Sequence, residues 1–292
     1  MTMLQDGRLF ATPVTEGGDT LVLAVETGNG TSMLYAAAAE RMGLELIPLV
    51  IGTDTAWLVE LPPLAPETEI PPLVETPDVG SRFFVFPADA DGEDGFLGQT
   101  WLAGRTWIFD YPAATIWLVP PDVLPSHRAD QRVPLGFRTD GQGQRVINVP
   151  RIRVRIGGDS LDLVLDTGAS AVFTDSALSR LDAGSPLRAA SFVSASVLER
   201  WRREHPDWEV VQDADSRTGM PMIRVPFVEV AGYRTGPVWF VAAPDDRFSD
   251  RASRLTDLPV SGALGGNVLR NFVVTVDYEE AIAIFERVGD GE

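Results

Sequence analysis

Two short segments of the chain place an acidic residue where it could do chemistry. The run from Asp166 to Ser170 reads Asp-Thr-Gly-Ala-Ser and follows the mostly apolar residues 161–165. A weaker copy, Glu26-Thr27-Gly28, follows the apolar residues 21–25. An acid at the end of a buried strand, followed by a hydroxyl residue and a glycine, presents its carboxyl group on a tight loop. The sequence therefore offers one candidate carboxyl group in each half.

Two carboxyl groups held about 3 Å apart share one proton, because both cannot ionise at low cost. The ionised member can take a proton from a water molecule, and the protonated member can donate its proton to an oxygen on which charge develops. This chemistry predicts an acid–base pair made of Asp166 and Glu26.

The neighbouring residues suit the support of such a pair. Thr27 and Thr167 can each donate a hydroxyl hydrogen bond to the opposite loop, which would hold the loops in register. A side chain at Gly168 would crowd the partner carboxyl group, and Ser170 can hydrogen-bond the outer carboxylate oxygen. The expected supporting residues are Thr27, Gly28, Thr167, Gly168 and Ser170.

The same landmarks recur, in the same order, in both halves of the chain. Residues 95–98 read Gly-Phe-Leu-Gly, and residues 262–265 read Gly-Ala-Leu-Gly. The pairs Asp110-Tyr111 and Asp277-Tyr278 follow these segments at the same separation. Two ordered landmarks in each half predict an internal repeat, with Asp110 and Asp277 as turn acids at strand ends.

The position of prolines divides the chain. Residues 119–134 are rich in proline and charge, and proline cannot donate to a sheet ladder. We therefore predict a first lobe over residues 1–120, a linker over residues 121–135 and a second lobe over residues 136–292. A second proline-rich stretch, residues 62–77, carries acidic residues and is expected to be a solvated surface loop.

Most of the remaining pattern is that of short strands with turn residues between them, which predicts a mainly β fold of two related barrel-like lobes. The clearest expected strands are residues 149–156, 161–165, 224–230, 237–242, 272–276 and 281–285. Helical patterns are few, at residues 34–42, 176–181 and 194–204.

Composition excludes several classes of function. The net charge of −18 repels phosphate backbones and anionic lipid, so neither nucleic acid nor a membrane surface is an expected partner. There is no cysteine, and the only histidines, His127 and His205, lie in polar segments, which disfavours a catalytic triad or a zinc site. No stretch is long enough to span a bilayer, and residues 1–18 lack a signal pattern. A cytoplasmic protein is favoured, while a secreted or periplasmic one stays open if a leader has been removed.

At the run Asp166 to Ser170, and at the apolar-apolar-Gly segments ending in Gly98 and Gly265, the chain resembles the retropepsin-like and pepsin-like aspartic peptidases. The resemblance covers most of the chain, and residues 40–44 are also similar to bacterial relatives. It implies a single-chain bilobal endopeptidase that cuts an extended peptide between two carboxyl groups without metal or organic cofactor. It also implies that the apolar-apolar-Gly strands fix the catalytic loops.

The first half departs from the family pattern. Glu26 stands where the family has Asp, and Asn29-Gly30 replace a small residue and a serine. The added methylene moves the carboxyl group by roughly a bond length, and a misplacement of about 1 Å can cost on the order of a hundredfold in rate. Whether Glu26 can act therefore depends on the position of its carboxyl group and not on its acidity, because the ordinary pKa values of Glu and Asp are close.

A peptidase of this kind also needs a flap that closes over the substrate. Residues 213–222 are the stronger flap candidate and residues 52–58 the weaker one. Two further functions stay open: a peptide-binding module of the same fold that no longer hydrolyses, and a homodimeric enzyme that pairs two copies of Asp166. The retained Thr27, Gly28 and residues 96–98 favour a monomer over the dimer.

Overall fold

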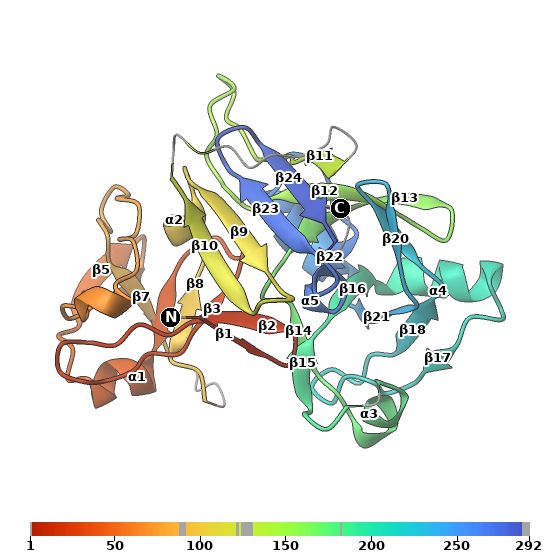
Figure 1. The fold of residues 1–292 in the computed structure, drawn as a ribbon, viewed down its shortest axis with the longest axis horizontal. Helices are drawn as coiled ribbons and strands as arrows, with labels where there is room; N and C mark the ends of the chain where they lie inside the picture. The colour runs from red at the N-terminus through yellow and green to blue at the C-terminus, as the bar shows by residue number, and fades with distance from the viewer. Residues whose placement is uncertain (1, 88–91, 121–122, 124–130, 182, 288–292) are drawn as a thin grey trace.

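A computed structural model describes residues 2–87, 92–120, 123, 131–181 and 183–287. Strands dominate it, and they form two lobes that lie side by side with a third sheet between them (Figure 1). The mainly β, two-lobed architecture predicted from the sequence is confirmed. In the described part of the chain, no helix combines the length and the apolar character that a membrane crossing requires.

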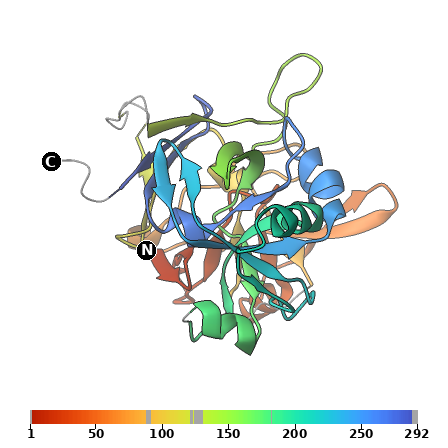
Figure 2. The ribbon, with the colours of Figure 1, turned by 90° about the vertical axis from the view of Figure 1, so that its right-hand side faces the viewer.

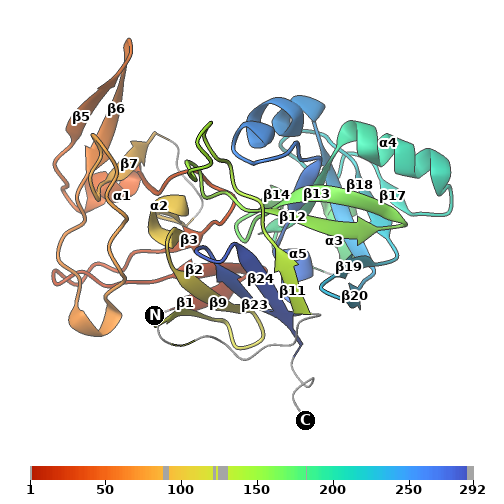
Figure 3. The same ribbon diagram turned by 90° about the horizontal axis from the view of Figure 1, so that it is seen from above.

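The first lobe is built on one sheet with the strand order β1-β2-β3-β8-β4-β7-β6-β5. The sheet buries one face against α2 and the third sheet, and the hairpin β5–β6 projects away from the lobe (Figure 3). Its strands are β1 (Thr2–Gln5), β2 (Arg8–Ala11), β3 (Leu23–Val25), β4 (Met33–Tyr35), β5 (Ile47–Ile51), β6 (Asp54–Val59), β7 (Phe83–Phe86) and β8 (Gly95–Leu97).

The second lobe is built on a sheet with the order β17-β18-β21-β16-β22-β13-β12-β19-β20. Seven of its neighbouring strands repeat the arrangement of the first sheet. The run β12-β13-β22-β16-β21-β18-β17 corresponds, in this order, to β2-β3-β8-β4-β7-β6-β5. The bounds are β12 (Arg151–Ile156), β13 (Asp159–Leu165), β16 (Ser191–Ser194), β17 (Val210–Val211), β18 (Met222–Val225), β19 (Val228–Val230), β20 (Tyr233–Thr235), β21 (Val238–Ala243) and β22 (Gly262–Leu264).

The third sheet joins the two halves of the chain. Its order is β10-β9-β23-β24-β11, and β9 pairs with β23 so that Ile108 lies opposite Thr275. The strands are β9 (Thr106–Asp110), β10 (Thr115–Val119), β11 (Arg132–Pro134), β23 (Val273–Asp277) and β24 (Ile282–Glu286). The largest buried cluster runs from both lobes into this sheet, so the lobes share one core.

Short helices cover the lobes. Figure 2 looks onto the second lobe and shows α4 on its outer side and α3 at its lower end. The helices are α1 (Ala36–Arg41), α2 (Gln99–Leu102), α3 (Asp175–Leu181), α4 (Ala195–Glu204) and α5 (Gly266–Leu269), with single turns η1 (Pro66–Thr68), η3 (Arg247–Arg251) and η4 (Ala252–Arg254). Strands β14 (Ser170–Val172) and β15 (Leu187–Ala189) form a separate pair.

Three expectations need comment. The expected strand 224–230 is two strands, because Pro226 cannot donate to a ladder and the chain turns there. The expected linker 121–135 lies mostly outside the described residues, and its last part forms β11 at the edge of the third sheet, where proline is tolerated. Asp110 and Asp277 are turn acids as expected, since each accepts backbone N–H bonds from the residues that follow it.

Candidate functional site

The loop that carries Glu26 is fixed by a parallel strand pair. Strand β3 ends at Val25, and β8 runs parallel to it with Val25 opposite Leu97. The Glu26 N–H group continues this ladder and donates to the Leu97 carbonyl oxygen at 2.9 Å. The acidic residue therefore leaves the sheet at a position that the buried Gly-Phe-Leu segment determines.

The loop that carries Asp166 is fixed in the same way. Strand β13 runs parallel to β22, with Leu165 opposite Leu264, and the Asp166 N–H group donates to the Leu264 carbonyl oxygen at 3.0 Å. The glycines that follow, Gly98 and Gly265, lie directly against the backbone of the neighbouring loop, where a Cβ atom would overlap a carbonyl oxygen. Glycine is required there because the loop packs on bare backbone.

A reciprocal hydrogen-bonded joint ties the two loops together. The Thr27 hydroxyl donates to the Leu165 carbonyl oxygen at 2.6 Å, and the Thr167 hydroxyl donates to the Val25 carbonyl oxygen at 2.5 Å. Each hydroxyl also accepts the other threonine's N–H group, at 3.1 and 3.0 Å. Both side chains are buried. We call these four bonds the threonine joint; they hold the loops in one relative position.

Replacing Thr27 with Val is expected to lower the free energy of unfolding by about 2–4 kcal/mol, because it leaves a buried carbonyl group and a buried N–H group without partners. Urea unfolding of the wild type and the variant measures this difference. Thr55→Val, at an exposed strand position, is the matched control and should change stability by less than about 0.5 kcal/mol. Equal losses for the two variants would mean that the joint carries little energy.

The joint brings each carboxyl group against the glycine of the opposite loop. A Cβ atom added at Gly28 would lie 2.5 and 2.8 Å from the two Asp166 carboxyl oxygens. One added at Gly168 would lie 2.7 Å from Cδ and 2.9 Å from Oε1 of Glu26. Each carboxyl group thus rests on the glycine of the opposite loop, and the longer Glu26 side chain comes as close to its glycine as Asp166 does.

The surroundings of the two carboxyl groups act differently on their pKa values. Burial, and next to it the charge of Asp166, raises the pKa of Glu26 to about 8. Burial also raises the pKa of Asp166, but the N–H groups of Gly168, Gly28 and Ala169 and the charge of Arg247 oppose that rise. The Gly168 N–H group donates to Asp166 Oδ1 at 3.1 Å. These contacts favour the ionised form of Asp166, whereas the raised pKa of Glu26 leaves that group protonated near neutral pH.

The hydrogen bonding of two residues near the pair differs from what the sequence suggested. Ser170 begins β14, and among the described residues its hydroxyl makes no hydrogen bond to Asp166; backbone N–H groups take that role instead. Asn29, which sequence reasoning treated only as a departure, donates from Nδ2 to Glu26 Oε2 at 3.2 Å. Its position directly after the motif was the one available signal, since a short amide can reach back three residues.

A pocket of about 580 Å³ opens beside Asp166. Gly28, Val164 and Ala263 line it, and Thr218 reaches it from the turn between β17 and β18. That turn falls within residues 213–222, the stronger flap candidate. In the described chain, no residue of the weaker candidate, the hairpin β5–β6, lines this pocket.

The other wall of the pocket carries positive charge. Arg247 and Arg251 lie on the single-turn segment η3, which nothing in the sequence marks as part of a site. Asp246 lines the same wall and pairs with Arg251 at 3.7 Å. The cleft is therefore locally basic at Arg247, in a chain whose net charge is −18.

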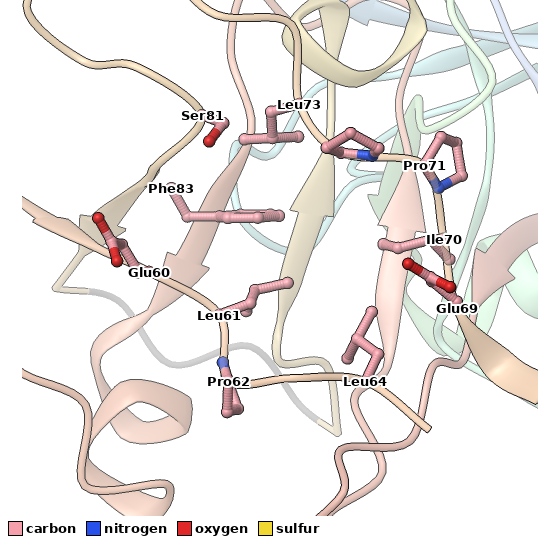
Figure 4. Close-up of a pocket in the computed structure, with 11 residues that line it drawn as sticks. Glu60, Leu61, Pro62, Leu64, Glu69, Ile70, Pro71, Leu73, Ser81 and Phe83 are labelled. Atoms are coloured by element: carbon pink, nitrogen blue, oxygen red, sulfur yellow. The ribbon is translucent and has the colours of Figure 1, made fainter. Parts of the chain in front are cut away.

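A second pocket, of about 420 Å³, lies in the first lobe away from both carboxyl groups. Figure 4 shows Leu61, Leu73 and Phe83 pointing into it, with Glu60 and Glu69 at its sides. The proline-rich stretch forms much of its wall and is not merely solvated, because Leu73 is buried and the Pro71 carbonyl oxygen accepts the Trp101 indole N–H at 2.9 Å. Its groups include no acid–base pair.

The two histidines and the possible metal ligands form no second candidate site within the described residues. His205 stacks on Trp208 with ring centroids 4.0 Å apart, and His127 lies outside the described residues. Within the described ranges, no group of histidines and acids could hold a metal ion.

No protein-family model matches the chain, and no curated protein matches it in sequence. Among solved structures, the aspartic proteinase from Irpex lacteus is similar to it, with a TM-score of 0.48 and 12% sequence identity. The match covers 97% of this chain and 94% of that one. At this level of identity, no residue receives a role from its counterpart.

Proposed function

We propose that the chain is an aspartic-type endopeptidase that hydrolyses peptide bonds through a water molecule activated between Asp166 and Glu26. The observation that carries the proposal is the threonine joint, which sets each carboxyl group against the glycine of the opposite loop. An arrangement of this kind holds two carboxyl groups close enough to share one proton, as the mechanism requires. No organic cofactor or metal takes part in this chemistry.

The two carboxyl groups have different roles. Asp166, whose ionised form the backbone N–H groups favour, takes a proton from the water as that water attacks the scissile carbonyl carbon. Glu26, whose pKa is raised to about 8, donates its proton to the carbonyl oxygen as charge develops there. Asn29 orients the Glu26 carboxyl group through the bond to Oε2. Asp166 then gives the proton it took from water to the leaving nitrogen as the C–N bond breaks, and Glu26 takes a proton back from a hydroxyl of the gem-diol, which becomes the new carboxyl group.

The substrate is an extended peptide that lies across the cleft between the lobes. The pocket beside Asp166 receives one of its side chains, and the β17–β18 turn, through Thr218, acts as the flap. The run of seven strands that follows the same order in the two lobe sheets supports an origin by duplication, with one carboxyl group contributed by each copy.

The proposal includes a monomeric active unit. The first half of the same chain occupies the place beside Asp166 where a homodimer would need its second Asp166, because Gly28 contacts that carboxyl group. A C2 dimer built on Asp166 would have to displace the whole threonine joint.

The dependence of kcat on pH is expected to be bell-shaped and to extend to neutral pH. Activity should rise as Asp166 ionises, at a pH above the ordinary aspartate pKa, and fall as Glu26 loses its proton near pH 8. Initial rates on one cleaved peptide between pH 3 and 9.5 measure both limbs. A falling limb below pH 6 would contradict the role of Glu26 as the protonated member.

The direct test is cleavage of a diverse peptide mixture by the purified chain, read by mass spectrometry, with solution mass measured on the same sample. Internal cuts by a monomer would support the proposal. A folded protein that cuts nothing at any pH would overturn it, and activity found only in a dimeric fraction would overturn the monomeric active unit.

A further inference from the structure

Arg247 lines the pocket beside Asp166, and among the described residues no carboxylate forms an ion pair with it; its charge acts on Asp166 from a longer distance. Its guanidinium carbon lies 4.5 Å from the centroid of the Phe192 ring and 5.8 Å from that of Phe248. Both rings are buried, so they form a fixed platform under the guanidinium group. The side chain as a whole remains exposed to the pocket. A cation held on aromatic faces keeps its hydrogen-bond donors free for a ligand.

The neighbouring charges leave Arg247 as the available cation. Asp246 is paired with Arg251, and Asp245 accepts the Ser196 N–H group at 3.0 Å. Asp166, which lines the same pocket, is committed to the proposed proton chemistry and accepts a backbone N–H group. A ligand carboxylate would therefore meet an unpaired guanidinium in a pocket that also contains the reacting group.

On the basis of the proposed function, we infer that Arg247 forms a substrate subsite that binds a carboxylate close to the scissile bond. Because Arg247 and Asp166 line one pocket of about 580 Å³, the carboxylate belongs to a residue within one or two positions of the bond that is cut. The planar guanidinium can bind it with two parallel hydrogen bonds. The same chemistry is offered by an Asp or Glu side chain and by the free C-terminus of a peptide.

The test compares matched peptides. From any peptide that the chain cleaves, four versions are made: one with Glu near the cut, one with Gln there, one with Lys there, and the Gln version shortened to end in a free carboxylate beside the cut. The wild type is expected to cleave the Glu version with a kcat/KM at least about tenfold above that of the Gln version. The shortened peptide, compared with its C-terminal amide, shows whether the terminal carboxylate is the ligand instead.

Variants at Arg247 must change the preference itself. Arg247→Gln is expected to bring the Glu-to-Gln ratio of kcat/KM close to one. Arg247→Glu is expected to cleave the Lys version with a higher kcat/KM than the Glu version. Arg234→Gln is the matched control. Arg234 lies on strand β20 of the second lobe, and its guanidinium carbon is also 4.5 Å from an aromatic ring centroid, that of Phe227. It should keep the wild-type ratio. A ratio near one in the wild type, for both kinds of carboxylate, would overturn the inference while cleavage itself upheld the proposed function.

A binding measurement separates this inference from the failure of catalysis. A random octapeptide mixture is passed over the immobilised Asp166→Asn variant and over the same variant carrying Arg247→Gln. Enrichment of acidic peptides that depends on Arg247 would support the subsite, even if the wild type cut nothing and the proposed function fell. Equal retention on the two surfaces would overturn the subsite.

Discussion

Replacing Asp166 with Asn is expected to reduce kcat by on the order of a thousandfold or more while leaving the fold intact. Asparagine has nearly the same shape, and its Oδ1 atom can still accept the Gly168 N–H group at 3.1 Å. It cannot take a proton from the attacking water, so the step that the pair accelerates is lost. Steady-state cleavage of one defined peptide at pH 6 measures the loss.

The control for this variant is Asp54→Asn, which makes the same change on an exposed strand of the first lobe. It should retain wild-type activity. Circular dichroism and urea unfolding should show both variants folded. If the Asp166→Asn sample cleaved the peptide at the wild-type rate, the mechanism through Asp166 would be wrong, or a contaminating peptidase would be responsible; repurification with the variant and control in parallel separates these outcomes.

Replacing Glu26 with Gln is expected to remove a large pH dependence of stability. The folded chain holds the Glu26 proton up to about pH 8, whereas the unfolded chain releases it near the ordinary glutamate pKa of 4.5. Between these values the folded state binds more protons than the unfolded state, so its free energy of unfolding falls as pH rises. The loss amounts to on the order of 4 kcal/mol by pH 8, after allowance for cleft water. Gln carries no such penalty.

Urea unfolding at pH 5 and pH 8.5 checks this result. The wild type should be less stable than Glu26→Gln at pH 8.5 and close to it at pH 5, because the groups outside the Glu26–Asp166 pair titrate alike in both proteins. Glu67→Gln, at an exposed position, should follow the wild type at both pH values. Parallel stability curves for wild type and Glu26→Gln would show that Glu26 is not held protonated by the fold.

Local patterns in the sequence were sufficient for the elements around the site. The Ala-rich run ending at Gly43 predicted α1, which stops where Gly43 takes a φ of +62°. The apolar run before Asp166 predicted β13, because buried strands have a strong compositional pattern. The resemblance to aspartic peptidases, rather than a local pattern, implied a strand beneath each loop at the two Gly-apolar-Leu-Gly segments, and β8 and β22 pair there.

Contacts between distant residues could not be predicted in this way. Arg247 reaches the pocket on a single π-turn with no periodicity, and its ring platform, Phe192, lies 55 positions earlier on another strand. Whether the Glu26 carboxyl group could reach the loop that carries Asp166 was likewise a matter of loop geometry. That geometry depends on packing between the halves and not on residue type. Ser170 failed as a carboxylate partner because β14 begins there and directs its backbone into pairing with β15.

The threonine joint also has a consequence for the order of folding. Its four bonds connect residues 138 to 142 positions apart, and each lobe sheet is complete without them. Closing so long a segment is slow and unfavourable until both lobes exist, so we expect the lobes to form first and dock last. Until docking, each half is expected to carry only one member of the Asp166–Glu26 pair. The paired site of the proposed peptidase is therefore expected to form in one late step, as a property of the docked chain and of neither half alone.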